Sequence, residues 1–189
     1  MKLYDISQEV FSCAVYPGDP KPQRQQLCST ARGDLYNLTA FSVVGAPFHF
    51  LREGRTVEQL DLDVFVGDCF LARHRGDVTA ADAVDILLRS GGAERLLIAG
   101  RATVTPEAAE RFAGAGLRLL GCESQSVGPE HAPMAVHLTL LGRGIALLEG
   151  LVLRDLPEGR YLLSAAPLNL AGADGAPCRA ILIDTEEHT

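Results

Sequence analysis

The sequence of 189 residues is 47% hydrophobic and 22% charged, which is the composition of a soluble globular protein with a well-formed core. We expect one domain over residues 1–189. The formal net charge of -7 argues against a strongly basic surface, so we expect neither nucleic acid nor an anionic membrane as a partner.

Three features of the sequence predict a cytoplasmic protein. Asp5 interrupts the apolar run that a signal peptide would need near the N-terminus. No stretch approaches the roughly 18 consecutive apolar residues of a membrane-spanning helix. The five cysteines are an odd, scattered set without a C-x-x-C pair, which favours reduced thiols; they are Cys13, Cys28, Cys69, Cys122 and Cys178.

Hydrophobic periodicity predicts the secondary structure in chain order. Strands are expected over residues 2–6, 38–44, 64–73, 95–99, 117–120, 145–149, 161–166 and 179–184, and residues 21–33 are expected as an edge strand or a loop. Helices are expected over residues 79–90, from Thr105 to about Gly114, and over residues 134–141. Strands and helices alternate in the middle, whereas the ends are rich in strands. This order predicts an α/β domain with a mixed sheet and helices packed on it.

Local signals predict where these elements begin and end. Thr79, with Asp82 three residues later, is expected to cap the first helix, and Gly91 is expected to end it. Thr105 precedes a proline at the first helical position, which is a typical helix start. Gly67 predicts a break in the strand over residues 64–73, in the form of a bulge.

The stretch from Asn37 to Phe50 reads as an uncharged buried strand that runs into a Gly-Ala-Pro turn. The turn delivers His49 between Phe48 and Phe50. A histidine just past a buried strand can face a pocket as a ligand or be a hydrogen-bonded core residue, and both interpretations stay open. The two phenylalanines and Tyr16 would likewise line an aromatic pocket or pack in the core.

A second stretch, from His137 to Leu151, joins a histidine to a carboxylate through a Leu-Leu-Gly-Arg-Gly turn. Glu149 follows a run of apolar residues, so a strand would carry its carboxylate into the interior. Burying a carboxylate costs several kcal/mol unless it is paired or bound to a metal. The alternative is that Glu149 lies at the solvent rim, at the end of its strand.

These two stretches resemble the metal-dependent cyclase family, which includes bacterial kynurenine formamidases. The first signature of that family is H-x-G-T-H-x-D-x-P-x-H, and Ala46-Pro-Phe-His-Phe50 resembles its tail. Gly45 stands where the signature has its Asp, and the two upstream histidines with the Gly-Thr between them are absent. Ser42-Val-Val44 stands in their place, which favours a short deletion that removes about half of the family's metal site.

The resemblance continues along the chain. Tyr16-Pro-Gly-Asp-Pro20 is similar to the family segment that shapes one wall of the substrate pocket. Glu123-Ser-Gln-Ser126 is similar to the segment after the family's central strand, so Glu123, Ser124 and Gln125 are expected to bind substrate or to close the loop. Phe48 and Phe50 complete the expected substrate-binding residues.

The resemblance implies the family's swivelling β/α/β fold, a barrel-like mixed sheet flanked by helices, and a homodimer or homotetramer. It also implies that His49, His137 and Glu149 bind a metal and that His49 and Glu149 are catalytic. Two histidines and one glutamate suit a catalytic zinc with one position left for water. We expect one zinc or manganese ion at most, or none, because the Asp that bridges two ions in the family is missing.

Three functions are compatible with this reading. The first is an arylformamidase-like hydrolase of a cyclic or N-acyl amide, in which one metal ion polarises the carbonyl and activates water. The second is a metal-free relative that keeps the pocket and binds a small molecule without turnover. The third is an inactive subunit that serves as an oligomer partner. The missing signature favours the second, whereas the retained His49, His137 and Glu149 favour the first.

Overall fold

The computed structural model describes residues 1–9, 11–12, 15, 21, 23–28, 38–42, 55–130, 133–173 and 175–184. Within residues 23–28 and 38–42 it describes the path of the backbone. None of the helices in these residues is long and apolar enough to cross a membrane.

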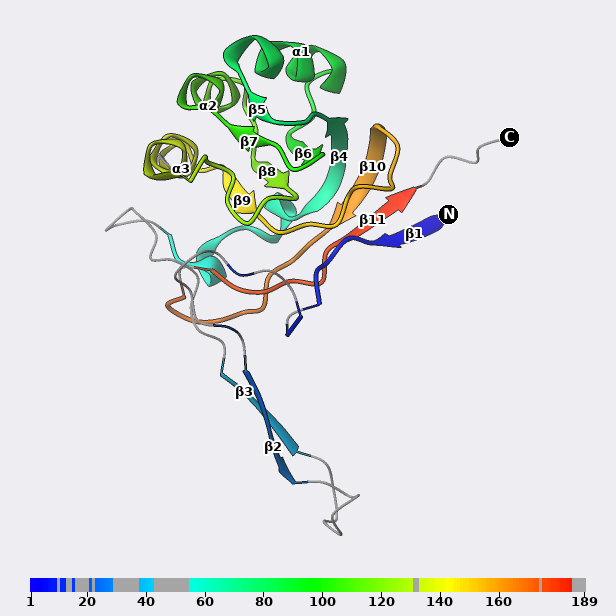
Figure 1. The fold of residues 1–189 in the computed structure, drawn as a ribbon, viewed down its shortest axis with the longest axis vertical. Coiled ribbons are helices and arrows are strands. Elements are labelled where there is room, and N and C mark those ends of the chain that lie inside the picture. The colour runs from blue at the N-terminus through cyan, green and yellow to red at the C-terminus, as the bar shows by residue number, and fades with distance from the viewer. Residues whose placement is uncertain are drawn as a thin grey trace.

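A seven-stranded mixed sheet forms the centre of the molecule, with strand order β1-β11-β10-β4-β6-β8-β9 (Figure 1). The strands are β1 (Lys2–Asp5), β4 (Val66–Arg73), β6 (Arg95–Ala99), β8 (Leu119–Cys122), β9 (Ala146–Leu148), β10 (Gly159–Ser164) and β11 (Ile181–Asp184). Strands β1, β11, β10 and β4 pair antiparallel, whereas β4, β6, β8 and β9 pair parallel. The predicted mixed sheet is therefore confirmed, with one antiparallel half and one parallel half.

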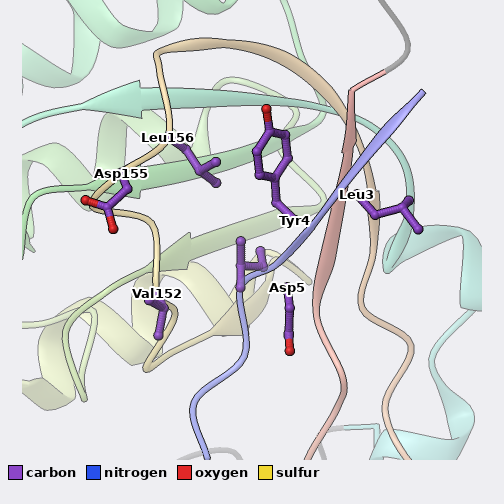
Figure 2. A pocket seen from close by; sticks show the side chains of 7 residues that line it. Leu3, Tyr4, Asp5, Val152, Asp155 and Leu156 are labelled. Carbon is purple, nitrogen blue, oxygen red and sulfur yellow. The ribbon is translucent and has the colours of Figure 1, made fainter.

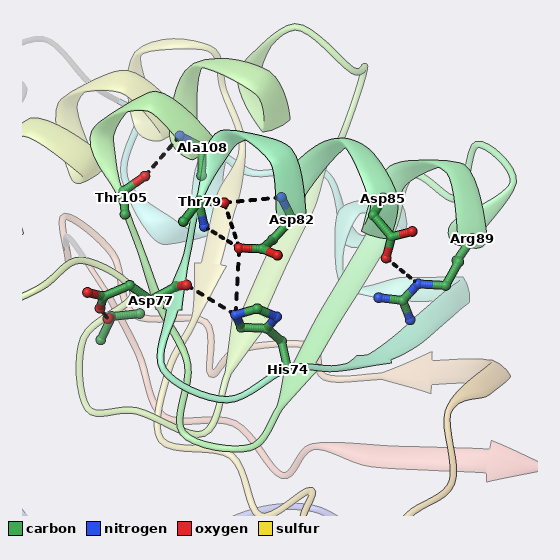
Figure 3. A network of polar contacts seen from close by, with 9 residues as sticks. His74, Asp77, Thr79, Asp82, Asp85, Arg89, Thr105 and Ala108 are labelled. Carbon is green, nitrogen blue, oxygen red and sulfur yellow. Dashed lines mark hydrogen bonds and ion pairs between the residues drawn. The ribbon is translucent and has the colours of Figure 1, made fainter.

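Three α-helices in the described residues cover one face of the parallel half, as Figure 1 shows; they are α1 (Ala80–Ser90), α2 (Pro106–Ala113) and α3 (Pro133–Gly142). The predicted start of α1 is confirmed, because Thr79 Oγ1 accepts from the Asp82 N–H at 3.3 Å while Asp82 accepts from the Thr79 N–H at 2.9 Å (Figure 3). Gly91 ends α1 in the left-handed conformation, with φ of 57°. Thr105 caps α2 in the same way as Thr79 caps α1, through the Ala108 N–H.

The sheet is buried on both faces, because alternate residues of its central strands enter two separate apolar clusters. Leu96 and Leu120 face the helices, where they pack with Phe112. Leu97 and Leu119 face the opposite side and belong to the cluster that contains Ile6, Leu153 and Leu163. All five residues of β6 are buried, as expected for a central parallel strand.

Strand β4 differs from the sequence prediction at Gly67. Its pairing with β10 runs without a register shift from Val66 to Leu71, so the predicted bulge is wrong. Gly67 has a φ of 145°, and a Cβ atom there would lie 2.8 Å from Cζ of Arg95. Arg95 is buried, and its Nε donates to the Val64 carbonyl at 3.0 Å. The glycine is thus required for the close approach of an arginine side chain and does not interrupt the strand.

Two smaller two-stranded sheets complete the described structure. Strands β2 (Gln23–Cys28) and β3 (Leu38–Ser42) form an antiparallel hairpin, so the polar segment is a strand and not a loop. This hairpin stands away from the seven-stranded sheet and the helices (Figure 1). Strands β5 (Asp77–Val78) and β7 (Thr103–Val104) form a short parallel pair beside the N-termini of α1 and α2.

Candidate functional site

The candidate site lies at the carboxyl edge of the parallel strands. Glu123 directly follows β8, and Glu149 directly follows β9. Because β8 and β9 are parallel neighbours, their carboxyl ends meet at one edge of the sheet. Open α/β sheets bind their ligands at this edge, where the backbone leaves the sheet and side chains can converge.

His137 reaches this edge from the second turn of α3. Its Nδ1 lies 2.8 Å from the carbonyl oxygen of Pro133, one turn earlier in the same helix. A carbonyl oxygen can only accept, so Nδ1 carries a proton in this arrangement. The other ring nitrogen, Nε2, lies 3.3 Å from Oε1 of Glu149. The structure therefore brings two of the three predicted metal ligands together.

The contact between His137 Nε2 and Glu149 Oε1 requires a proton or a metal ion between the two atoms. In a neutral imidazole with its proton on Nδ1, Nε2 is an acceptor, and it faces a carboxylate oxygen that is also an acceptor. Burial of His137 opposes charging, but the hydrogen bond and the charge of Glu149 outweigh it and raise the pKa of His137 above its usual value. The same two lone pairs fit a divalent cation, which would replace the proton.

Glu149 is held by the backbone and is partly open to solvent. The N–H of Val127 donates to Glu149 Oε1 at 2.7 Å, so this oxygen serves both Val127 and His137. Among the described residues, Oε2 has no hydrogen-bond partner. The side chain of Glu149 is 29% exposed, against 11% for His137. Of the two alternatives for Glu149, the structure shows the one at the solvent rim, at the end of its strand.

Glu123 connects three segments of the site through hydrogen bonds. Its Oε2 accepts from the N–H of Gly100, which follows β6, and its Oε1 accepts from the N–H of Leu153 at 2.9 Å. Both oxygens are thus engaged with the backbone. The hydroxyl of Ser124 donates to the carbonyl of Ala102 at 2.9 Å. These bonds close the loop after β8, and the predicted binding of substrate by Glu123 and Ser124 stays a prediction.

Gln125 forms a hydrogen bond with Gln8, a residue that the sequence analysis did not identify. Its Nε2 donates to Oε1 of Gln8 at 3.3 Å, and both side chains are half-buried. Gln8 comes from the segment after β1, which is anchored where Ile6 accepts from the Val152 N–H at 2.9 Å. Both amides lie close to Gly150, the residue after Glu149. No local sequence signal marks Gln8, because its place depends on a contact across most of the chain.

Ser126 is a second residue that sequence reasoning left without a role. Its hydroxyl oxygen is buried and has no hydrogen-bond partner in the part of the chain that the structure describes. Ser126 directly precedes Val127, whose N–H binds Glu149. An unpaired buried hydroxyl costs free energy, so this atom does not stabilise the loop through a hydrogen bond to the described residues.

Comparison with known proteins identifies the family. No protein-family model matches the chain. A protein of Salinibacter ruber named kynurenine formamidase is 34% identical over 211 residues, covering 99% of this chain and 100% of its own. A protein of the same name from Paracidovorax citrulli is also 34% identical, covering 95% of both chains. The chain belongs to the metal-dependent cyclase family of the bacterial kynurenine formamidases.

Solved structures agree with membership of the cyclase family. A structure described as a potential metal-dependent hydrolase with cyclase activity superimposes with a TM-score of 0.81 at 26% identity, covering 98% of this chain and 99% of the other. Isatin hydrolase A from Labrenzia aggregata superimposes with a TM-score of 0.80 over 98% of this chain and 94% of the other. At 18% identity the second comparison supports the fold alone. The expected cyclase-family fold is confirmed.

Four of the predicted site residues lie outside the described part of the chain. They are Tyr16, Phe48, His49 and Phe50. Within the described residues, no group of three or more His, Cys, Asp or Glu side chains is arranged to hold a metal ion. Of the three predicted metal ligands, His137 and Glu149 are in contact in the described residues, and the metal-binding role of all three stays a prediction.

The structure also contains a hollow of about 320 Å³ between β1 and the segment that follows Leu151. Figure 2 shows the side chains that surround it; they are Leu3, Tyr4, Asp5, Ile6, Val152, Asp155 and Leu156. None of these is a residue of the candidate site, and the two charged groups, Asp5 and Asp155, are paired with Arg179 and Arg154. None of the predicted metal ligands thus lines this hollow.

Proposed function

We propose that this protein is an arylformamidase-like hydrolase that cleaves the carbon–nitrogen bond of a cyclic or N-acyl amide with at most one metal ion per subunit. The observation that carries the proposal is the contact of 3.3 Å between His137 Nε2 and Glu149 Oε1. Membership of the family agrees with it, because the relatives from Salinibacter ruber and Paracidovorax citrulli are named kynurenine formamidase.

The proposed metal ligands are His137, Glu149 and His49, and the metal is zinc or manganese. The hydrogen bond from Nδ1 to the Pro133 carbonyl supports this role for His137, because it fixes the ring and leaves the Nε2 lone pair for a cation. The bond from the Val127 N–H orients Glu149 in the same way. When bound, the ion would polarise the substrate carbonyl and activate water. Oε2 of Glu149 is the oxygen that would accept the proton of the attacking water.

A reduced metal site is supported by the length of the chain. The alignment with the Salinibacter ruber protein runs over 211 residues and covers all of that protein, whereas this chain has 189. This chain therefore lacks positions that the relative has. The sequence Ser42-Val-Val44, where the signature has its upstream histidines, is consistent with a deletion at that point. A site with one ion follows, because the bridging Asp is absent.

The proposal also covers the oligomeric state, the cellular location and the partners of the enzyme. We propose a homodimer or homotetramer in the cytoplasm, with a small molecule as the substrate and neither nucleic acid nor a membrane as a partner. The net charge of -7 and the odd, scattered set of cysteines support this setting.

A second candidate function is an inactive relative that binds a small molecule or serves as an oligomer partner. The absence of the front half of the signature favours it, because three of the family's ligands are missing from the sequence. In that case the pair His137 and Glu149 would be joined by a proton at all times, and added metal would not bind.

The test is a metal analysis of the purified protein together with an assay on N-formylkynurenine and on simple lactams. The proposal expects up to one divalent ion per subunit and hydrolysis that is lost after chelation and restored by zinc or manganese. Two ions per subunit would overturn the reduced site. Absence of turnover, with no rise in melting temperature on addition of zinc or manganese, would establish the inactive relative instead.

A further inference from the structure

The side-chain amides of Gln8 and Gln125 lie against Gly150, the residue that follows Glu149. Gly150 has a φ of 72°, and a Cβ atom on it would lie 2.9 Å from Nε2 of Gln8 and 3.4 Å from Nε2 of Gln125. The Gly150 N–H also donates to the Ser124 carbonyl at 2.9 Å, so the backbone here is fixed. Glycine at this position lets the two amides lie against the main chain of the residue that follows Glu149.

The amides of Gln8 and Gln125 retain unused hydrogen-bonding capacity. One hydrogen bond joins them, from Nε2 of Gln125 to Oε1 of Gln8, at 3.3 Å. A glutamine amide offers two N–H donors and an oxygen with two lone pairs. Within the described residues, neither the Nε2 group of Gln8 nor Oε1 of Gln125 has a partner. One donor group and one acceptor are therefore left in this pair of amides next to Gly150.

This donor and acceptor match the polar edge of a secondary amide. An amide carbonyl can accept from Nε2 of Gln8, and an amide N–H can donate to Oε1 of Gln125. Exchanging the nitrogen and oxygen of both glutamines leaves one donor group and one acceptor again, so the match does not depend on their orientation. An ester shares the carbonyl but has no N–H to donate.

We propose that Gln8 and Gln125 bind the amide group of the substrate beside Glu149 and determine the preference for an amide over the corresponding ester. The inference rests on the proposed function, and it names the substrate group that the site recognises. Oε1 of Gln125 can only accept, so an ester would leave it unpaired in a partly desolvated site. A site built to hydrogen-bond an N–H rejects analogues that lack one for this reason.

The first experiment compares N-formylaniline with phenyl formate on the variants Gln125→Met and Gln8→Met. Methionine keeps the length of the side chain and removes the amide. Gln125→Met should lower kcat/KM for the amide by about 10-fold and change that for the ester less than about 3-fold. Gln8→Met should lower kcat/KM for both substrates, because both present a carbonyl. Gln59→Met makes the same chemical change at an exposed position and should alter neither.

The second experiment uses a pair of glycines. Gly116 has a φ of 77°, close to the 72° of Gly150, but a Cβ atom on Gly116 would meet nothing within 4 Å. Both Gly150→Ala and Gly116→Ala therefore place alanine in the left-handed region, and both should lose stability for that reason. Gly150→Ala should in addition displace the amide pair and lower the ratio of amide to ester activity. Gly116→Ala should leave that ratio unchanged.

The outcomes separate this inference from the proposed function. If the wild-type protein hydrolyses neither substrate, the proposed function fails, and the amide pair is then tested by calorimetric binding of N-formylaniline. Weaker binding to Gln125→Met and Gln8→Met than to Gln59→Met would support the pair. The inference is overturned if neither Gln125→Met nor Gln8→Met lowers amide activity more than ester activity, or if both variants bind the amide as wild type does.

Discussion

Nε2 of His137 lies 3.3 Å from Oε1 of Glu149, and the bond from Nδ1 to Pro133 makes this distance chemically informative. With Nδ1 fixed as a donor, the two facing atoms are both acceptors unless a proton or a metal joins them. The helix α3 and the end of β9 supply the two residues from opposite sides of a tight turn. The arrangement therefore favours a proton or a metal ion between Nε2 of His137 and Oε1 of Glu149.

Replacement of Glu149 by Gln should remove the metal ion. The variant keeps the size of the side chain but loses the negative charge that offsets the cation, and its amide would present an N–H to Nε2 or to Val127. Metal analysis should find close to none of the ion that the wild type carries. Glu107→Gln, on the exposed side of α2, makes the same charge change away from the site and should keep the ion. Unchanged metal content in Glu149→Gln would exclude Glu149 as a ligand.

Replacement of Glu123 by Gln should destabilise the fold at the edge of the sheet. One of the two carboxylate oxygens becomes an NH2 group, which then faces the N–H of Gly100 or of Leu153. The free energy of unfolding in urea should fall by about 1–3 kcal/mol, because one acceptor is lost and a buried donor is left unpaired. Glu107→Gln should stay within about 0.5 kcal/mol of wild type. A similarly small change in Glu123→Gln would show that the carboxylate does not fasten these segments.

The secondary structure could be predicted from the sequence because its signals are local. The cap of α1 uses Thr79 and Asp82, three residues apart, and its end uses a glycine whose conformation no other residue adopts as easily. The strands β6 and β8 were found from short apolar runs because the sheet buries them on both faces. The strand order, by contrast, depends on pairing between distant segments, and the family resemblance implied only the type of fold.

The candidate site could be predicted only in part. His137 and Glu149 belong to a motif within one stretch of sequence, and the structure brings them together. The exposure of Glu149 could not be predicted, because an apolar strand can end either inside the protein or at its rim. Gln8 was missed because its partner, Gln125, is 117 residues away and neither residue has a local signal. The surroundings of Gly67 were misjudged for the same reason, since Arg95 approaches it from a neighbouring strand.

Ser126→Ala should show whether the buried hydroxyl of Ser126 forms a hydrogen bond in the folded protein. In the absence of ligand the Oγ atom has no partner among the described residues, so its removal should not destabilise the protein. Thermal unfolding should show a free energy equal to that of wild type or higher by up to about 1 kcal/mol. Ser124→Ala is the control, because that hydroxyl donates to Ala102 and its loss should cost stability. A clear destabilisation of Ser126→Ala would mean that the hydroxyl is bonded in solution.

Glu158→Gln should lower stability in a way that depends on pH. Glu158 joins α1 to the sheet, because it pairs with Arg89 and accepts from the Arg73 N–H at 2.9 Å. Partial burial would raise the pKa of Glu158, but these bonds and charges outweigh it and hold the pKa below its usual value of 4.5. A lowered pKa means that the stabilisation is fully present above pH 4.5 and is lost as the pH falls through the value in the folded protein. The difference in unfolding free energy between wild type and Glu158→Gln should be about 1 kcal/mol at neutral pH and should shrink progressively as the pH falls below 4.5, as followed by urea denaturation. Glu107→Gln is the control, and its difference from wild type in unfolding free energy should stay small at both neutral and acidic pH. A difference for Glu158→Gln that does not shrink on acidification would contradict the role of the ionised carboxylate.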